Sequence, residues 1–236
     1  MNEPVLIFGR EWAVTIALAS VLTPILNVSI IPAFDLDDLD HKLVEYRKSP
    51  IILGISPHEH VAPLYQLRKQ LSGRCVLFVA RRFWWADYCL PAFAGIEWCE
   101  FCTLDNLVIS RDETVQNKSL IYSSWGDYAN CFAADKVSVI SDIPPEDILY
   151  RANLWLQKHM RLAGLSGVES MVLIRLSENA PIRMSPHRLS YYKLKGLSKL
   201  GMSKHVVNLY RGVKVRPELQ MPFLSADNDC SSNRRY

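Results

Sequence analysis

The side chains best suited to a chemical role lie in residues 186–199, which hold no Asp or Glu. Cations and polar side chains gather there, namely Arg188, Lys193, Lys195, Lys199, His187, Ser190 and Tyr191. Leu189, Tyr192, Leu197 and Leu200 recur at helical spacing, which predicts one packed and one cationic face. Such a helix fits the major groove of double-stranded DNA, where Lys and Arg neutralise phosphates and polar side chains meet base edges. The spacing also fits a merely solvated basic face, and Tyr191 also suits simple packing.

Cysteine and histidine offer a second possibility. Cys99 and Cys102 form a lone CxxC, the spacing of a redox pair or of half a zinc site, and His58, His60 and Cys89 are available to complete a tetrahedron. No second CxxC or HxxxH motif follows, so we favour small, reduced core cysteines. No nucleophile–base pair stands out either. We expect no catalytic residue, no metal site and no cofactor, and hence a protein that is not an enzyme.

Length and charge limit the classes of protein. The 236 residues suffice for one large domain or two small ones, and 49% apolar with 22% charged residues is ordinary globular usage. Residues 1–150 hold 12 Lys and Arg against 19 Asp and Glu, whereas residues 151–236 hold 15 against 5. The two parts are therefore expected to meet different partners.

Residues 12–34 carry no charged side chain and have the length of a membrane span or a signal peptide. Thr15, Ser20, Pro24 and Asn27 interrupt this stretch, and no cluster of cations precedes it. We therefore expect a strand–helix–strand segment of a soluble, cytoplasmic protein without membrane contact.

The elements that position these side chains follow from periodicity. Short apolar runs alternate with amphipathic ones up to residue 101, which predicts a doubly wound α/β domain, residues 1–107, with a five-stranded parallel sheet. The strands are expected at residues 4–8, 28–34, 50–55, 75–80 and 96–101, and helices at 11–22, 38–47, 63–71 and 87–94. An Asp in the acidic run 35–40 is expected to cap the second helix.

Beyond residue 102 this alternation fades. Residues 108–145 are polar, carry isolated aromatic residues and end in Pro144 and Pro145, which predicts a linker. Helical patterns then occur at residues 146–162, 168–176, 186–200 and 203–213. We expect an all-α helix-turn-helix domain over residues 146–214 and a flexible tail over residues 215–236.

Residues 185–201 resemble the final helix of LuxR/FixJ (NarL)-type helix-turn-helix domains. Ser185, Leu189 and the Lys199-Leu200-Gly201 ending match the family pattern in register, whereas Arg188, Tyr192 and Gly196 depart from it. The resemblance implies base contacts by Ser190 and Tyr191. It implies phosphate or base-edge contacts by Arg188, Lys193 and Lys195.

Two alignments of the upstream helices remain open. Residues 165–169 can mirror the start of the family's first helix, which leaves too few residues for the scaffold helix before Ser185. Alternatively, residues 146–162 are the opening helix and residues 168–176 the scaffold helix, with an enlarged turn over residues 177–184. We favour the second alignment because it supplies every helix of a trihelical core.

Residues 1–107 are similar to response-regulator receiver domains, and the scaffold residues Pro57 and Gly95 match. Receivers need acidic Mg²⁺ ligands, a phosphate-accepting Asp, a hydroxyl and a Lys. The residues at these positions are instead Gly9 with Arg10, Gly54, Ala80 and Cys102. This implies a pseudo-receiver that takes up no phosphate. The alternative is another doubly wound domain such as a nucleotide binder, although no Gly-rich loop follows the first strand.

A cluster that follows the fourth predicted strand comprises Arg81, Arg82, Phe83, Trp84 and Trp85. Arg and aromatic residues are favoured interface anchors, and receivers use this region for dimer contacts, so we expect a partner here. The alternative is that at least one Trp fills the core.

The resemblance implies a DNA-binding transcriptional regulator. It would act independently of phosphorylation as a dimer with itself or with another response-regulator-like protein. Enterobacterial auxiliary regulators of capsule, acid-resistance and fimbrial genes are similar. The alternative is an adaptor that binds and sequesters another regulator without touching DNA; Gly196 and the enlarged turn are the features that favour it.

Overall fold

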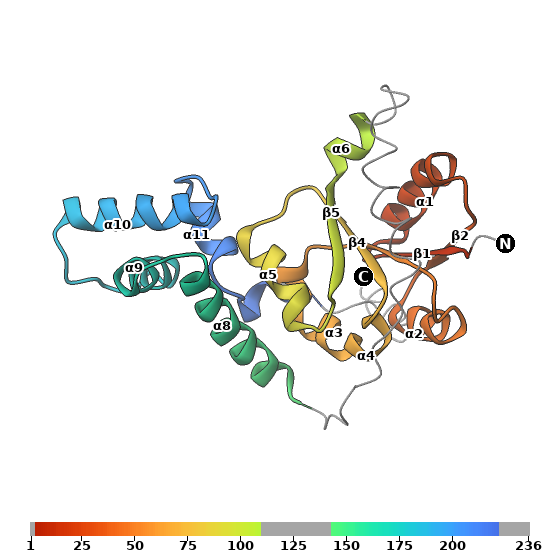
Figure 1. Ribbon diagram of the computed structural model, residues 1–236, viewed down its shortest axis with the longest axis horizontal. Helices are drawn as coiled ribbons and strands as arrows, with labels where there is room; N and C mark the ends of the chain where they lie inside the picture. Colours follow the sequence, from red (N-terminus) through yellow and green to blue (C-terminus); the bar gives the residue numbers. More distant parts are fainter. Residues whose placement is uncertain (1–2, 110–142, 222–236) are drawn as a thin grey trace, which may run out of the picture.

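The computed structural model of the chain describes residues 3–109 and 143–221. Most of the expected linker, and residues 222–236 of the expected tail, lie outside the described residues. Two modules are present: a sheet covered by helices, formed by residues 3–109, and a helical module formed by residues 143–221 (Figure 1). No helix in these two ranges combines the length and the apolar character needed to cross a bilayer.

The first module contains the expected five-stranded parallel sheet. Its strands are β1 (Val5–Gly9), β2 (Ile30–Ala33), β3 (Ile51–Gly54), β4 (Cys75–Ala80) and β5 (Trp98–Thr103), in the order β2-β1-β3-β4-β5. This is the flavodoxin-like order of doubly wound folds, whose functional residues gather at the carboxyl ends of the central strands. At those ends Gly9 of β1 pairs in register with Gly54 of β3.

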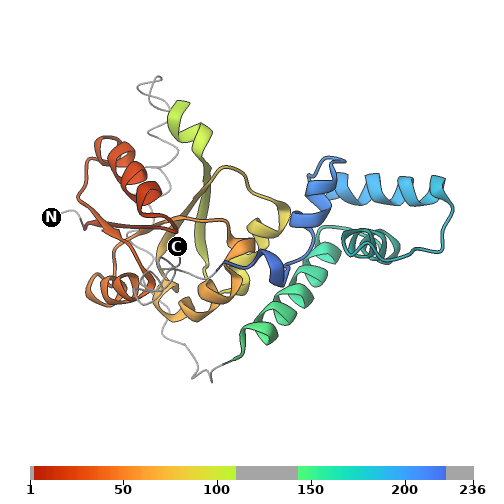
Figure 2. The ribbon, with the colours of Figure 1, turned by 180° about the vertical axis from the view of Figure 1, so that it is seen from behind.

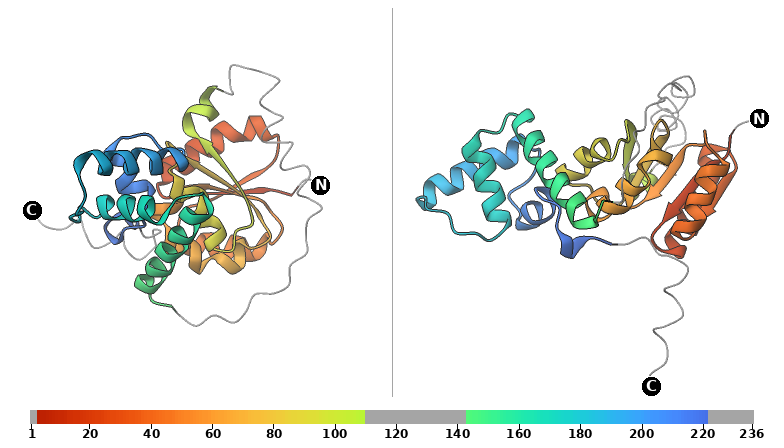
Figure 3. Two further views of the ribbon diagram at one scale, coloured as in Figure 1. Left: turned by 60° about the vertical axis from the view of Figure 1, so that its left-hand side comes forward. Right: turned by 90° about the horizontal axis from the view of Figure 1, so that it is seen from below.

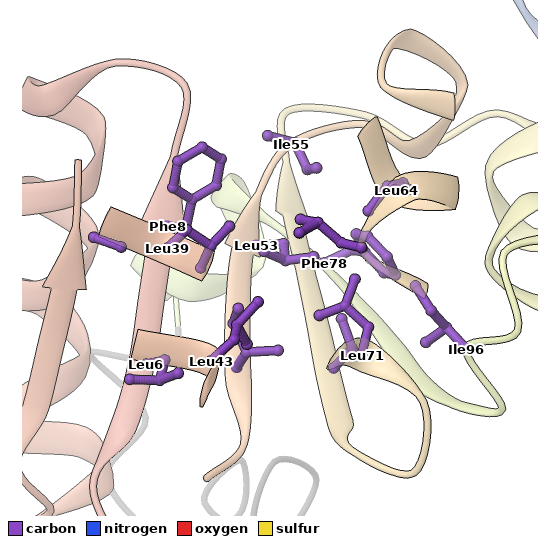
Figure 4. Close-up of a cluster of buried hydrophobic side chains, with 14 of the residues drawn as sticks. Leu6, Phe8, Leu39, Leu43, Leu53, Ile55, Leu64, Leu71, Phe78 and Ile96 are labelled. Atoms are coloured by element: carbon purple, nitrogen blue, oxygen red, sulfur yellow. The ribbon is translucent and has the colours of Figure 1, made fainter. Parts of the chain in front are cut away.

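Helices cover both faces of the sheet because buried side chains alternate along the strands. Leu6 and Phe8 point to one face, which packs against α2 (Leu36–Glu45), α3 (Val61–Gln66) and α4 (Arg68–Leu71), as Figure 4 shows in close-up. Val5 and Ile7 point to the other face, covered by α1 (Trp12–Leu26) and α6 (Leu104–Ile109). Helix α5 (Trp85–Phe93) and the 3-10 turn η1 (Pro57–Glu59) complete the module.

The local signals that fix these helices are mostly those expected. The Asp35 carboxylate accepts a hydrogen bond from the Asp38 backbone N–H and caps α2, as predicted. Helix α1 extends beyond the predicted residue 22 to Leu26, with Pro24 inside its last turn, and Asn27 ends it in the left-handed region at φ 52°. Pro24 therefore does not terminate the helix, because packing of Leu22 and Leu26 on the sheet outweighs one missing N–H.

The second module consists of α8 (Pro145–Leu162), α9 (Gly167–Ser177), α10 (Pro186–Lys199), α11 (Val206–Gly212) and the 3-10 turn η2 (Pro217–Leu219). Its core joins residues of all four α-helices and the loops between them, namely Met160, Leu165, Leu173, Leu197, Leu200, Leu209 and Val213. Gly164 follows α8 at φ 81°, a left-handed position that suits glycine and lets the chain turn into α9.

Helix α8 begins within one residue of the expected start of the helical domain, but it packs mainly on the sheet module. Only Met160, at its end, joins the core of the helical module. Ile148, Leu149, Ala152 and Leu156 pack instead against α3 and α5 of the sheet module, and α8 lies between the two parts of the chain (Figure 3). The apolar stripe of α8 thus faces two partners, which its helical period alone does not reveal.

The expectation of a flexible tail from residue 215 is wrong for residues 215–221. Val215 is fully buried, and its backbone exchanges two hydrogen bonds with the Asn153 side chain, at 2.8 and 3.0 Å. Gln220 accepts from the Val61 N–H and donates to the His58 carbonyl, and the Met221 N–H donates to the Glu59 carbonyl. We call residues 215–221 the strap, because hydrogen bonds that each involve a backbone group fix this segment across both modules.

Candidate nucleic-acid interface

Helix α10 projects from the end of the molecule farthest from the sheet, and the sheet module does not cover it (Figures 1 and 2). At about 100° per residue, the buried Gly196, Leu197 and, just past the helix, Leu200 define its inner side. The opposite side is exposed along its whole length. We call it the outer face, formed by His187, Arg188, Tyr191, Leu194, Lys195 and Ser198. The expected cationic face therefore exists, with Arg188 and Lys195 as its charges.

Two of the predicted contact residues lie elsewhere on this helix. Lys193 is half-buried on the inner side, four residues after Leu189 and four before Leu197. The spacing of Lys193 from Leu189 and Leu197 in the sequence is enough to predict this inner position. Ser190 is exposed but lies beside the outer face rather than at its centre. The geometry thus favours Tyr191, with 52% exposure, over Lys193 as a group that can meet a ligand.

Lys199 is engaged within the chain. Its Nζ lies 2.7 Å from Oε2 of Glu169 and donates to the Gly164 carbonyl at 2.7 Å. Glu169, at the start of α9, is 1% exposed and completes a capping box with Ser166, whose N–H donates to Oε2 at 2.7 Å. Lys199, one of the cations expected to face DNA, therefore joins the end of α10 to the start of α9, a contact that we call the clamp.

The charge of Glu169 is stabilised at this clamp. Burial by itself would raise the pKa of Glu169, but the hydrogen bonds from Lys199 and Ser166 and the charge of Lys199 together lower it to about 2. Lys195 adds a weaker attraction, because its Nζ lies 3.7 Å from Oε1 and remains 48% exposed. Sequence reasoning missed Glu169, although the Ser166-to-Glu169 spacing is that of a capping box.

Lys195 and Tyr191 form one exposed unit on the outer face. The Lys195 Nζ lies 5.5 Å from the centre of the Tyr191 ring and 3.4 Å from its hydroxyl, one helical turn away. The hydrogen bond to Tyr191 and the nearby charge of Glu169 raise the pKa of Lys195, so this cation stays charged over the physiological range.

The turn between α9 and α10 is enlarged, as the favoured alignment requires. Residues 178–185 join the helices, whereas an ordinary helix-turn-helix uses about three or four residues. The helices still pack closely, because a Cβ at Gly196 would lie 3.0 Å from Leu173 Cδ1. Gly196 thus serves close helix contact. The alignment is less satisfactory for residues 146–162, since α8 docks mainly on the sheet module.

At the carboxyl ends of β1 and β3, close packing surrounds the two glycines. A Cβ at Gly54 would lie 3.0 Å from Leu18 Cδ1, and one at Gly9 would lie 2.9 Å from Oγ1 of Thr15. The Thr15 hydroxyl is fully buried and donates to the carbonyls of Gly9 and Glu11. Side chains of helix α1 thus fill the space beside Gly9 and Gly54, the positions at which the sequence lacks the expected acidic residues.

The predicted interface cluster is divided by the structure. Trp84 is buried, and Trp85 packs against the hydrophobic clusters of both modules, so the two Trp residues serve a contact within the chain. Arg81 and Arg82 are exposed, and the half-buried Phe83 packs on the sheet. The two Arg residues are thus the exposed members of the cluster, although the Arg82 guanidinium lies 5.5 Å from the centre of the Trp84 ring.

Cys99 and Cys102 do not form a redox pair. They point to opposite faces of the sheet, three residues apart on one strand, and pack in different hydrophobic clusters. Burial and the nearby charge of Glu100 raise the pKa of each thiol to about 11, which makes both unreactive. Within residues 3–109 and 143–221, no three His, Cys, Asp or Glu side chains are arranged to hold a metal ion.

His58 serves a polar contact network between the modules. Its Nδ1 and its backbone N each lie 2.8 Å from Oδ1 of the fully buried Asp87, while Oδ2 of Asp87 accepts from the Trp84 N–H. The adjacent Glu59 carboxylate accepts from Arg211 of α11. From the sequence alone we consider His58 only as a ligand of a disfavoured metal site and miss Arg211, because the partners of both residues are distant in the chain.

No family model matches the chain, and no curated protein matches it in sequence. Solved structures match it in fold. The two-component response regulator RcsB in complex with DNA gives a TM-score of 0.54 at 17% identity, over 89% of this chain and 96% of that one. Two RcsB dimers bound to two parallel DNAs give 0.53 at 15% identity, over 89% and 97%. The chain therefore shares the two-part fold expected for it, a receiver-like sheet module followed by helices.

Proposed function

We propose that this chain is a transcriptional regulator that binds double-stranded DNA through α10. The single observation that carries this proposal is the outer face, a continuous exposed surface with Arg188, Lys195 and Tyr191 and no acidic side chain. Residues 145–221 hold 13 Lys and Arg against 5 Asp and Glu, so the surrounding field favours a polyanion. The RcsB structures with DNA have the same fold and are consistent with this use of it.

The same geometry weakens the case for an adaptor without DNA binding. That alternative depended on Gly196 and on the enlarged turn as signs of a degenerate recognition unit. Gly196 is explained by its close contact with Leu173, and the enlarged turn leaves α9 and α10 packed together. Because α9 supports it, α10 can enter the major groove of DNA as a rigid helix.

We further propose that the sheet module works without phosphorylation and brings chains together. The packing of Thr15 and Leu18 at the ends of β1 and β3, and the absence of a carboxylate at Gly54, support the first part. Exposed Arg81 and Arg82 support a partner at the end of β4, either a second copy or another receiver-like protein. A dimer would present two copies of α10 to two half-sites.

The test is DNA binding as a function of salt, by gel shift or fluorescence anisotropy with the full chain and genomic fragments. Lys195→Ala should weaken binding to all duplexes and lower the salt slope by about 0.9 for each phosphate that the variant no longer neutralises. Lys69→Ala is the matched control, because it removes one exposed charge from α4 of the sheet module. Absence of binding to any duplex, or equal slopes for both variants, contradicts the proposal.

A further inference from the structure

We infer that Leu194 reads the 5-methyl group of a thymine in the major groove, an inference that rests on the proposed function and names a specificity determinant within it. Leu194 is 47% exposed and belongs to no hydrophobic cluster of the described residues. Packing therefore does not explain this side chain.

Exposure alone would carry little, because single exposed apolar residues are common on protein surfaces. The position of Leu194 is the informative feature. On α10 its neighbours at one helical turn are the exposed Ser190 and Ser198, and Tyr191 and Lys195 lie beside it on the outer face. Leu194 is thus the aliphatic side chain on an otherwise polar and cationic face.

The chemistry of the groove identifies the ligand group. Base edges in the major groove present hydrogen-bond donors and acceptors, and thymine adds the apolar C5-methyl group. A Leu flanked by hydroxyls and a cation matches that combination: Lys195 can reach a phosphate or an acceptor, the serines can reach base edges, and Leu194 can cover the methyl group. If the outer face bound a protein surface instead of DNA, replacing thymine by deoxyuridine in a duplex would change nothing.

The experiment compares thymine with deoxyuridine, which lacks only that methyl group. A bound duplex is first selected from a random library with the full wild-type chain, and each thymine is then replaced singly by deoxyuridine. At one position per half-site we expect affinity to fall about fourfold for wild type, the value of one buried carbon group. Leu194→Ala should bind more weakly and should lose that sensitivity, while the effects of other base changes persist.

Leu162→Ala is the matched control, since it shortens an exposed Leu at the end of α8, which is no part of the outer face, and should keep the full deoxyuridine effect. Leu194→Ala places a good helix former at an exposed site, so unchanged thermal unfolding verifies its fold. If no duplex is selected, the proposed function itself fails. If duplexes bind but no deoxyuridine weakens wild type, or Leu194→Ala keeps the same penalty, only the role of Leu194 is overturned.

Discussion

Replacing Glu169 by Gln tests whether the clamp between α9 and α10 holds the recognition helix in place. The Glu169 side chain is 1% exposed, and its Oε2 accepts two hydrogen bonds of 2.7 Å, one from the Lys199 ammonium group and one from the Ser166 backbone N–H. Glutamine keeps the shape but removes the charge. Hydrogen bonds to charged groups contribute about 1.5 to 3 kcal/mol each, and breaking a buried ion pair costs about 3 to 5 kcal/mol.

The expected loss for Glu169→Gln is smaller than that of a fully buried pair. Lys199 is 32% exposed, so its ammonium group can turn to water when its partner is neutral. We therefore expect the free energy of unfolding to fall by about 2 kcal/mol, within the range for hydrogen bonds to charged groups. Urea titrations of the full chain at pH 7 measure this difference.

The pH dependence gives an independent check. The pKa of Glu169 is about 2 in the folded protein against an ordinary value of 4.5, so its stabilisation is present above pH 4.5 and is lost as the pH falls towards 2. The difference in the free energy of unfolding between wild type and Glu169→Gln should therefore become smaller as the pH falls over that range. Glu178→Gln is the control: its pair with Lys214 is more exposed, so it should cost less than about 0.5 kcal/mol. If this difference does not change with pH, or if Glu169→Gln loses no more unfolding free energy than Glu178→Gln, the clamp does not stabilise the fold as proposed.

Three further predictions concern the sheet module and the junction. Gly54→Asp should accept no phosphate from acetyl phosphate, as measured by mass spectrometry. The same variant should lower the free energy of unfolding by about 1 to 3 kcal/mol, because its Cβ would press on Leu18. Arg211→Met should loosen the helical module, seen as faster limited proteolysis and a larger radius of gyration in scattering; an unchanged radius would count against the Glu59 contact. Cys99 should resist alkylation at pH 8 until urea unfolds the protein, since burial raises its pKa to about 11; rapid labelling of the native chain would show the thiol to be accessible.

Much of the fold could be predicted from local signals. The alternation of strand and helix up to residue 101, the Asp35 cap and the position of α10 depend on residues close in sequence, and the structure has them within a few residues of their expected places. Periods of 2 and 3.6 residues, together with caps, act over one or two turns, which is why single segments reveal them.

The candidate site was only partly predictable. The sequence predicts a cationic helix, but net charge alone does not show which of its four cations face outward. In the structure, Arg188 and Lys195 face outward, Lys193 lies on the inner side, and Lys199 is held by a carboxylate 30 residues earlier in the chain. The inner position of Lys193 follows from its spacing to neighbouring Leu residues, whereas the Lys199 pair depends on how α9 meets α10.

The order of amino acids is enough to predict which segments form strands and helices, where positive charge gathers, and that position 54 carries no carboxylate. The inward position of Trp84 and Trp85, the docking of α8 on the sheet module and the crossing of the strap between modules depend instead on how the folded segments pack together. Gln220 donates to the His58 carbonyl 162 residues away, a contact that local periodicity does not encode. Such pairings depend on which surfaces meet after collapse, since one apolar stripe or one amide can satisfy several partners equally well.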